Sequence, residues 1–263
     1  IGAKFDPETQ ARARTLFTKV LDCPGGGLRI DTIHAFAQYL LAAFPEEAGL
    51  EPGTVAMDDR TRALLAREVL TDLVMHADED DRSALAMLSR KLSPDGAKTW
   101  LIACAKAREL WEGRAGWQSP MRPQVLQLLG LPGDFDEAQL AQDCADGAFD
   151  TASLNACLAT LRDWDTKGGR EGTEAINAWL AGDPAQRLAG LGGFNGTLFV
   201  ADGSKPKNLN HLAKRDPAYE GHIEAVRTCC EGIREKLALL ALAEYLTPAL
   251  ELGRRFALRW DEV

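Results

Sequence analysis

The sequence is that of a globular, acidic chain of 263 residues. It is 46% hydrophobic and 26% charged, and 30 lysines and arginines against 39 aspartates and glutamates give a formal charge of −9 at pH 7. This composition excludes a disordered or collagen-like chain. The negative charge excludes a protein that coats nucleic acid with its whole surface, although a local basic patch is still compatible with it. The length fits one large domain or two small ones.

The cysteines, the first ten residues and the longest apolar stretch indicate the cellular compartment. The six cysteines form no Cys-x-x-Cys motif, so in a chain of this length they are interpreted as reduced thiols. The first ten residues lack the apolar core of a signal peptide, and the longest apolar stretch, residues 237–250, is too short to span a bilayer. We therefore expect a cytoplasmic protein without a membrane segment. Because the sequence begins with isoleucine, we also expect either a processed chain or a piece of a longer one.

The first part of the chain combines helices with one isolated strand. Residues 7–21 and 34–44 have the apolar spacing of helices, with Asp6 as a candidate N-cap and Pro7 in the first turn. Between them, residues 28–33 alternate apolar and polar side chains, which predicts a strand. A single strand leaves its backbone groups unpaired. We therefore expect this segment either to pair with something outside the sequence or to be remodelled.

The rest of the chain is predicted to be helical, with one exception. Residues 196–200 form a short β-like run, and Asp202-Gly203 after it is typical of a hairpin turn. Residues 217–260 have a long helical pattern with Pro248 as a candidate kink. The expected fold class is therefore all-α with one small β-hairpin-like excursion. Further helices are predicted over residues 58–75, 83–92, 96–111, 123–129, 136–144, 151–164, 173–180 and 184–188.

No motif for nucleotide, metal or nucleophilic chemistry is complete. The glycine runs at 25–27 and 190–193 lack the Gly-Lys-Ser/Thr ending of a phosphate loop and the spacing of a dinucleotide-binding loop. The four histidines have no metal-binding spacing. The adjacent Cys229 and Cys230 fit a buried helix face better than a redox pair. We therefore expect no catalytic residue, no metal site and no cofactor in this sequence.

Two segments are suited to an anionic partner. Thr32 and His34 stand where the predicted strand ends and a helix begins, so a hydroxyl, an imidazole and free backbone N–H groups meet at a helix N-terminus. This arrangement suits phosphate, and an ordinary helix cap is the alternative. Cations also follow the predicted hairpin turn, where they would either contact a nucleic-acid backbone or form a solvated loop. They are Lys205, Lys207, Lys214 and Arg215.

The same two segments resemble one protein family. Residues 28–50 (LRIDTIHAFAQYLLAAFPEEAGL) resemble AddA, the helicase–nuclease subunit of a bacterial double-strand-break repair complex and a member of the UvrD/Rep-like superfamily 1 helicases. Ala37 stands where the family usually has cysteine. Residues 197–207 (TLFVADGSKPK) are similar to a second AddA segment that also precedes a lysine-rich stretch and a long helix. Residues 58–193 match only as a variable helical region.

The resemblance implies an accessory region of a larger motor protein. The nucleotide-binding loop and the Walker B motif of such helicases would lie outside this sequence. Residues 1–33 would be a remnant of the first RecA-like motor domain, and residues 34–263 a helical accessory domain of the kind called 1B. The parent would be an ATP- and Mg²⁺-dependent DNA helicase and exonuclease with an AddB-like partner subunit.

The resemblance also implies roles for the candidate residues. Thr32 and His34 would contact the backbone of single-stranded DNA in the motor groove. The four cations near the hairpin would contact duplex DNA ahead of a fork. None of these six residues would be catalytic.

A second hypothesis is that the helical domain is a scaffold that docks the partner subunit without contacting DNA. Residues 134–183 hold eleven acidic side chains against three basic ones. At least one face of the protein would therefore repel DNA. A third hypothesis, a stand-alone helical enzyme, lacks a convergent polar pocket that the sequence could reveal.

Overall fold

The computed structural model describes residues 6–22, 31–112 and 116–262. Contacts divide the chain into two compact units, Ile1–Leu64 and Leu65–Val263. The sequence predicts a motor-domain remnant up to residue 33 and an accessory domain after it. The boundary between the compact units does not test this division, which stays a prediction. The two units are taken one at a time.

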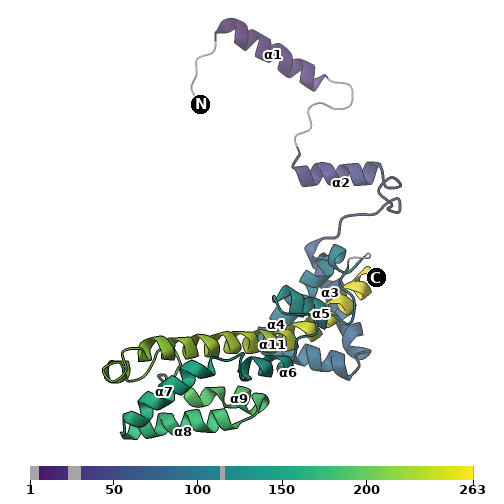
Figure 1. The fold of residues 1–263 in the computed structure, drawn as a ribbon. Coiled ribbons are helices and arrows are strands. Elements are labelled where there is room, and N and C mark those ends of the chain that lie inside the picture. Colours follow the sequence, from purple (N-terminus) through teal and green to yellow (C-terminus); the bar gives the residue numbers. More distant parts are fainter. Residues whose placement is uncertain (1–5, 23–30, 113–115, 263) are drawn as a thin grey trace. The chain divides into compact units, whose positions relative to one another are not determined.

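The first unit contains two separate helices, α1 (Pro7–Leu21) and α2 (Ile33–Ala43) (Figure 1). Asp6 caps α1 as predicted, because its carboxylate accepts a 2.9 Å hydrogen bond from the backbone N–H of Thr9. No residue of α2 is buried. The described part of this unit therefore has no core of its own.

The strand predicted over residues 28–33 is wrong in its described part. Residues 28–30 lie outside the described residues, Asp31 and Thr32 belong to no strand, and Ile33 is already the first residue of α2. Thr32 instead caps the helix, with its hydroxyl accepting from the N–H of Ala35 at 3.2 Å. Since the described chain offers this segment no partner strand, the helix is the structure that pairs its backbone groups internally.

The second unit is a helical assembly, and α3 crosses the boundary between the units. The predicted all-α fold is confirmed. The helices are α3 (Asp59–Met75), α4 (Glu79–Lys106), η1 (Arg108–Leu110), α5 (Arg122–Leu128), α6 (Glu137–Ala141), η2 (Gln142–Cys144), α7 (Thr151–Asp163), α8 (Lys167–Ala181), α9 (Pro184–Gly190), η3 (Leu191–Phe194), α10 (Leu209–Leu212) and α11 (Tyr219–Asp261).

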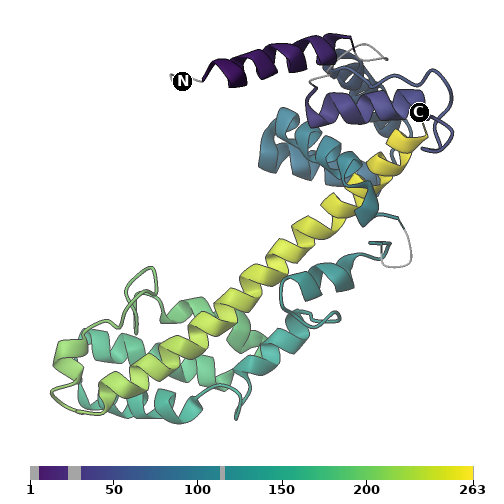
Figure 2. The same cartoon turned by 90° about the horizontal axis from the view of Figure 1, so that it is seen from above.

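The second unit is built on α11, a continuous helix of 43 residues that spans about 65 Å at a rise of 1.5 Å per residue. It runs from one group of helices to the other (Figure 2). Its first half packs into a core formed with α5 to α10, and its second half packs into a separate core formed with α3 and α4. The first core buries Tyr219, Ile223, Val226, Cys230, Ile233, Leu240 and Ala243 of α11, and the second buries Ala249, Leu252, Phe256 and Ala257.

Two prolines in helical segments have different effects. Pro94 follows Ser93, whose backbone (φ 68°, ψ 164°) interrupts α4, because a residue before proline avoids helical geometry. The Ser93 hydroxyl accepts from the N–H of Gly96 at 3.2 Å and starts the second part of α4. The interruption falls between the helices predicted over residues 83–92 and 96–111. Pro248, the candidate kink, lies within α11, which stays one continuous helix.

The predicted β excursion is confirmed as a tight hairpin between η3 and α10. The N–H of Val200 donates to Lys205 and that of Lys207 to Leu198, at 3.0 and 2.8 Å. The turn closes through Gly203, whose N–H donates to Val200 at 2.8 Å and whose φ of 76° favours glycine. The pairing stays at isolated bridges, and no regular strand forms among the described residues.

A buried arginine joins three elements of the first core. Arg187 on α9 is 7% exposed and donates to the carbonyls of Cys144 and Leu180, at 3.1 and 2.8 Å, and to the carboxylate of Asp146 at 2.6 Å. Its guanidinium lies 5.0 Å from the ring of Trp179. It thereby links η2, α8 and α9.

In the described part of the chain, no helix is long and apolar enough to cross a membrane.

Leu252→Ala should lower the free energy of unfolding by about 2–5 kcal/mol, because Leu252 is fully buried in the second core and the substitution leaves a cavity. Urea unfolding followed by circular dichroism measures this change. Leu110→Ala, at a side chain that is 51% exposed, is the control and should change stability by less than about 0.5 kcal/mol. Equal losses in the two variants would contradict the assigned core.

Arg187→Met should also destabilise the protein, because it removes the donors of two backbone carbonyls. Each buried carbonyl that loses its partner costs about 1–3 kcal/mol. The same urea assay measures the loss. The control is Arg162→Met, since Arg162 makes one exposed hydrogen bond of 3.2 Å to Asn177, and a cost similar to that of Arg187→Met would refute the proposed network.

Candidate nucleic-acid interface

The hairpin that carries the predicted cations is fixed to α11. Arg234 of α11 donates to the side-chain oxygen of Asn195 at 2.7 Å. A Cβ atom on Gly203 would lie 2.8 Å from the same guanidinium, so the turn packs directly against Arg234. Leu198 and Phe199 are buried in the first core. The hairpin is therefore a rigid projection, and its exposed residues are held in place.

Three of the four predicted cations are exposed, and two of the four are engaged in contacts within the protein. Lys205 and Lys214 are exposed. Lys207 is half-buried, and its ammonium group donates to the carbonyl of Gly196. Arg215 donates to the carboxylate of Asp163 at 2.6 Å and to the carbonyl of the same residue at 3.0 Å. Lys205 and Lys214 are therefore the two cations that can bind a phosphate without breaking a hydrogen bond such as those of Lys207 and Arg215.

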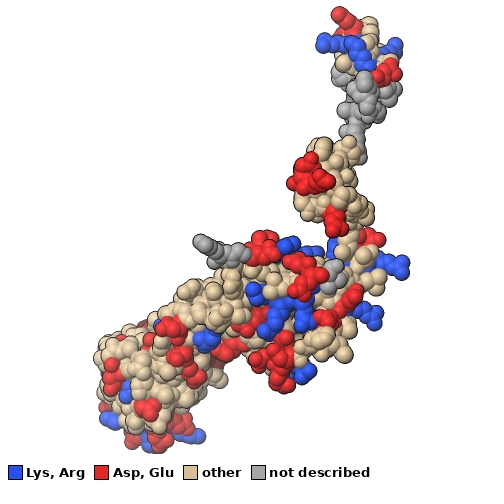
Figure 3. Space-filling view, turned by 90° about the vertical axis from the view of Figure 1, so that its right-hand side faces the viewer, with Lys and Arg blue, Asp and Glu red and all other residues tan. Residues whose placement is uncertain are grey.

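The surroundings of the hairpin are only weakly basic. Besides the Arg215–Asp163 pair, Arg170 pairs with Asp165 at 2.8 Å. The pKa of Asp202 in the turn is lowered, chiefly by hydrogen bonds from Ser204 and further by Lys205. At the hairpin, a polyanion would therefore find individual lysines among paired charges. On another face of the second unit, Figure 3 shows blue and red side chains interspersed.

One aromatic contact near these lysines was not predicted. His211 on α10 is exposed, and its ring lies nearly parallel to that of Trp164, with centroids 6.3 Å apart and planes 11° apart. Lys214 follows three residues later. Neither ring belongs to a recognisable motif, because Trp164 and His211 come together only through the packing of α7 against the segment around α10.

Thr32 and His34 lie in the first unit, at the start of α2. The Thr32 hydroxyl already accepts the N–H of Ala35, and its carbonyl accepts the N–H of Phe36 at 2.9 Å. His34 is exposed. The local geometry is therefore an ordinary helix cap, the alternative considered for this segment, with an imidazole presented to solvent beside it.

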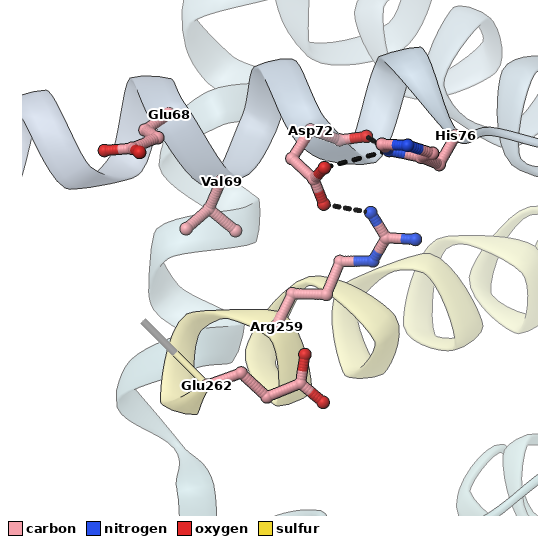
Figure 4. A pocket seen from close by; sticks show the side chains of 6 residues that line it. All are labelled: Glu68, Val69, Asp72, His76, Arg259 and Glu262. Carbon is pink, nitrogen blue, oxygen red and sulfur yellow. Dashed lines mark hydrogen bonds and ion pairs between the residues drawn. The ribbon is translucent and has the colours of Figure 1, made fainter.

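A polar groove of about 530 Å³ lies between α3 and the last turns of α11 (Figure 4). Asp72 is its centre, because its carboxylate accepts from Arg259 and lies 2.8 Å from Nδ1 of His76. Val69 lines the groove between the charged groups. The side chains of Asp72 and His76 are exposed, and that of Arg259 is half-buried. The arrangement holds the end of α11 against α3 and offers no nucleophile.

An ion pair with one buried partner also lies at this end of α11. Arg255 pairs with Asp81 of α4, and the Asp81 side chain is 8% exposed. Arg255 and Arg259 are one helical turn apart, so consecutive turns of α11 bind α4 and α3. The i, i+4 spacing of Asp72 with His76, and of Arg255 with Arg259, is the signal through which these groups could have been suspected in the sequence.

The buried cysteines are unsuited to nucleophilic chemistry. The five described cysteines are free thiols, and four of them are buried. Burial raises the pKa of Cys104 to about 11 and that of Cys157 to about 12, so both stay protonated near neutral pH. Among the residues that the structure describes, no group of three or more histidine, cysteine or carboxylate side chains could hold a metal ion.

No family model, no curated protein and no solved structure matches this chain.

The buried thiols should resist alkylation in the native protein. At pH 8, iodoacetamide should modify Cys229, which is half-exposed, well before Cys104, Cys157 and Cys230, because a raised pKa leaves little thiolate. Peptide mass spectrometry of timed samples measures the order. Protein unfolded in urea is the control and should lose the difference, whereas rapid native labelling of Cys157 would contradict its burial.

Proposed function

We propose that this chain is a DNA-engaging accessory region of an ATP-dependent, AddA-like helicase–nuclease that acts in double-strand-break repair and recombination. The observation that carries the proposal is the hairpin. The segment that resembles AddA in sequence folds into a rigid projection fixed to a long helix. It presents Lys205 in the turn, and Lys214 follows in the next segment.

The proposed chemistry is electrostatic contact with the DNA backbone. Exposed lysines bind phosphate oxygens and release counterions, which gives affinity without base specificity. Duplex DNA at a fork would contact the hairpin, and Thr32 and His34 would contact single-stranded backbone. These residues position DNA and take no part in bond cleavage.

The catalytic parts belong to the proposed parent protein. ATP and Mg²⁺ would be bound by motor motifs outside this sequence, and DNA cleavage by a nuclease domain further along the parent chain. An AddB-like subunit would be the protein partner, and the complex would act in the cytoplasm.

The exposure of Lys205 and Lys214 selects these two residues for a DNA-binding test. Lys205→Ala/Lys214→Ala should weaken binding to a fluorescent forked DNA, measured by anisotropy between roughly 50 and 200 mM salt. Each lost phosphate contact lowers the slope of log affinity against log salt by about 0.9, so the double variant should lose about 1.8.

The matched control removes two exposed cations elsewhere on the second unit. Arg67→Ala/Lys106→Ala changes the net charge equally and should leave the slope nearly unchanged. Lys207→Ala is a further control, because the Lys207 ammonium group already donates to the carbonyl of Gly196 inside the hairpin. No binding at low salt, or equal losses in the two double variants, would refute the proposed hairpin contact.

A second candidate function, a scaffold that docks a partner protein, is favoured by the charge pairing around the hairpin. Arg215 and Arg170 are both bound to acidic neighbours, so DNA would meet a largely compensated surface. A fragment that acts only as a scaffold would show no salt-dependent DNA binding.

A further inference from the structure

The aromatic pair near Lys214 leaves one ring open to solvent. The imidazole of His211 is exposed and lies nearly parallel to the indole of Trp164, with planes 11° apart and centroids 6.3 Å apart. Parallel rings in full face-to-face contact would have centroids only about 3.5–4.0 Å apart. The two rings therefore overlap little, and the indole leaves much of the imidazole face uncovered.

The indole behind His211 is held in place. Trp164 is half-buried and packs against the first core. A Cβ atom on Gly168 would lie 3.4 Å from the indole and 3.6 Å from the side-chain nitrogen of Asn208. The start of α8 and the residue before α10 therefore both border the indole, and His211 lies beside a fixed ring.

An uncommitted cation stands on the same side of the chain as His211. The turn after α10 continues the course of that helix, because the N–H of Arg215 donates to the carbonyl of Leu212 at 2.9 Å. Residues three positions apart on such a turn are neighbours, with Cβ atoms about 5–6 Å apart. Lys214 is exposed and forms no ion pair with a described residue. An ammonium group is thus available next to the open imidazole face.

The acidic side chains of this region are already engaged. Asp163 pairs with Arg215 at 2.6 Å. Asp165 pairs with Arg170 at 2.8 Å. The carboxylate of Asp216 accepts two hydrogen bonds from within the protein, at 3.2 and 2.9 Å. An anion that approaches Lys214 therefore meets none of these three carboxylates unpaired.

The combination of an open ring face and a free lysine suits a nucleotide of a single strand. Bases in a duplex are stacked on each other, whereas an unpaired base can offer its face to an aromatic side chain. Proteins that bind single strands combine such stacking with cations along the backbone. Lys205 in the adjoining hairpin is a second exposed cation, which suits a ligand that carries one charge per residue.

We propose that the exposed face of His211 stacks on an unpaired base of single-stranded DNA while Lys214 binds an adjacent phosphate. This inference rests on the proposed function and refines it, because it places separated strands of a fork beside the hairpin. Trp164 fixes the surface behind His211 and does not itself contact the base.

The probes are a fluorescein-labelled oligothymidylate and an oligomer of equal length in which every base is replaced by an abasic site. Both carry the same phosphates, but only the first can stack. Binding to the 263-residue chain is followed by anisotropy. The oligothymidylate should bind about tenfold more tightly, which corresponds to 1.4 kcal/mol and lies within the range for one stacked base.

Three variants separate stacking from charge. His211→Ala should abolish the preference for the oligothymidylate, and His211→Phe, which keeps a ring without a charge, should retain it. Lys214→Ala should weaken both oligomers equally and lower the slope of log affinity against log salt by about 0.7. His76→Ala, at another exposed histidine, is the matched control and should change nothing.

A preference for the oligothymidylate that persists in His211→Ala, or no binding of the oligothymidylate at low salt, would overturn the proposal. An equal loss for both oligomers in His211→Ala would assign His211 a purely electrostatic role and would also overturn it.

A blunt duplex separates this inference from the proposed function. Duplex binding that is lost in Lys205→Ala/Lys214→Ala, together with no base preference on single strands, would refute the inference and leave the proposed function standing. A base preference that depends on His211, without any binding to the blunt duplex, would refute the proposed duplex contact while this inference stands.

Discussion

The second unit depends on the continuity of α11. One helix of 43 residues supplies buried side chains to two separate hydrophobic cores, and among the described elements no other contributes to both to this extent. Because nucleation is the costly step of helix formation and extension adds one hydrogen bond per residue, a helix stabilised at both ends stays helical between them. This explains how α11 continues through Pro248, where one backbone hydrogen bond is necessarily missing.

Polar contacts fasten other elements to this helix at two levels. Arg255 and Arg259 bind Asp81 and Asp72 near its C-terminus, and Arg234 binds the hairpin near its middle. Arginine suits these positions because its planar, always charged fork can hold a carboxylate or an amide oxygen in a fixed orientation. The long helix therefore carries the hairpin and the α3–α4 group as attached parts of one framework.

The charges of the hairpin region bear on both candidate functions. Interleaved ion pairs lower the long-range attraction for DNA, so any DNA contact here depends on the few exposed lysines and on screening by salt. The same compensation removes the repulsion that a strongly charged surface would impose on a protein partner.

The sequence by itself determined the helical fold class and several local features. Periodicity and turn chemistry act over a few residues, so the Asp6 cap, the break at Ser93 and the Gly203 turn were predictable from neighbours in the chain. Thr32 shows the limit of local patterns, because its segment alternates like a strand and becomes a helix cap where no described strand pairs with it. Tertiary structure alone decided which charges are available. Arg215 meets Asp163 across 52 residues, and Leu237 is exposed while Leu240 is buried only because the first core covers one side of α11.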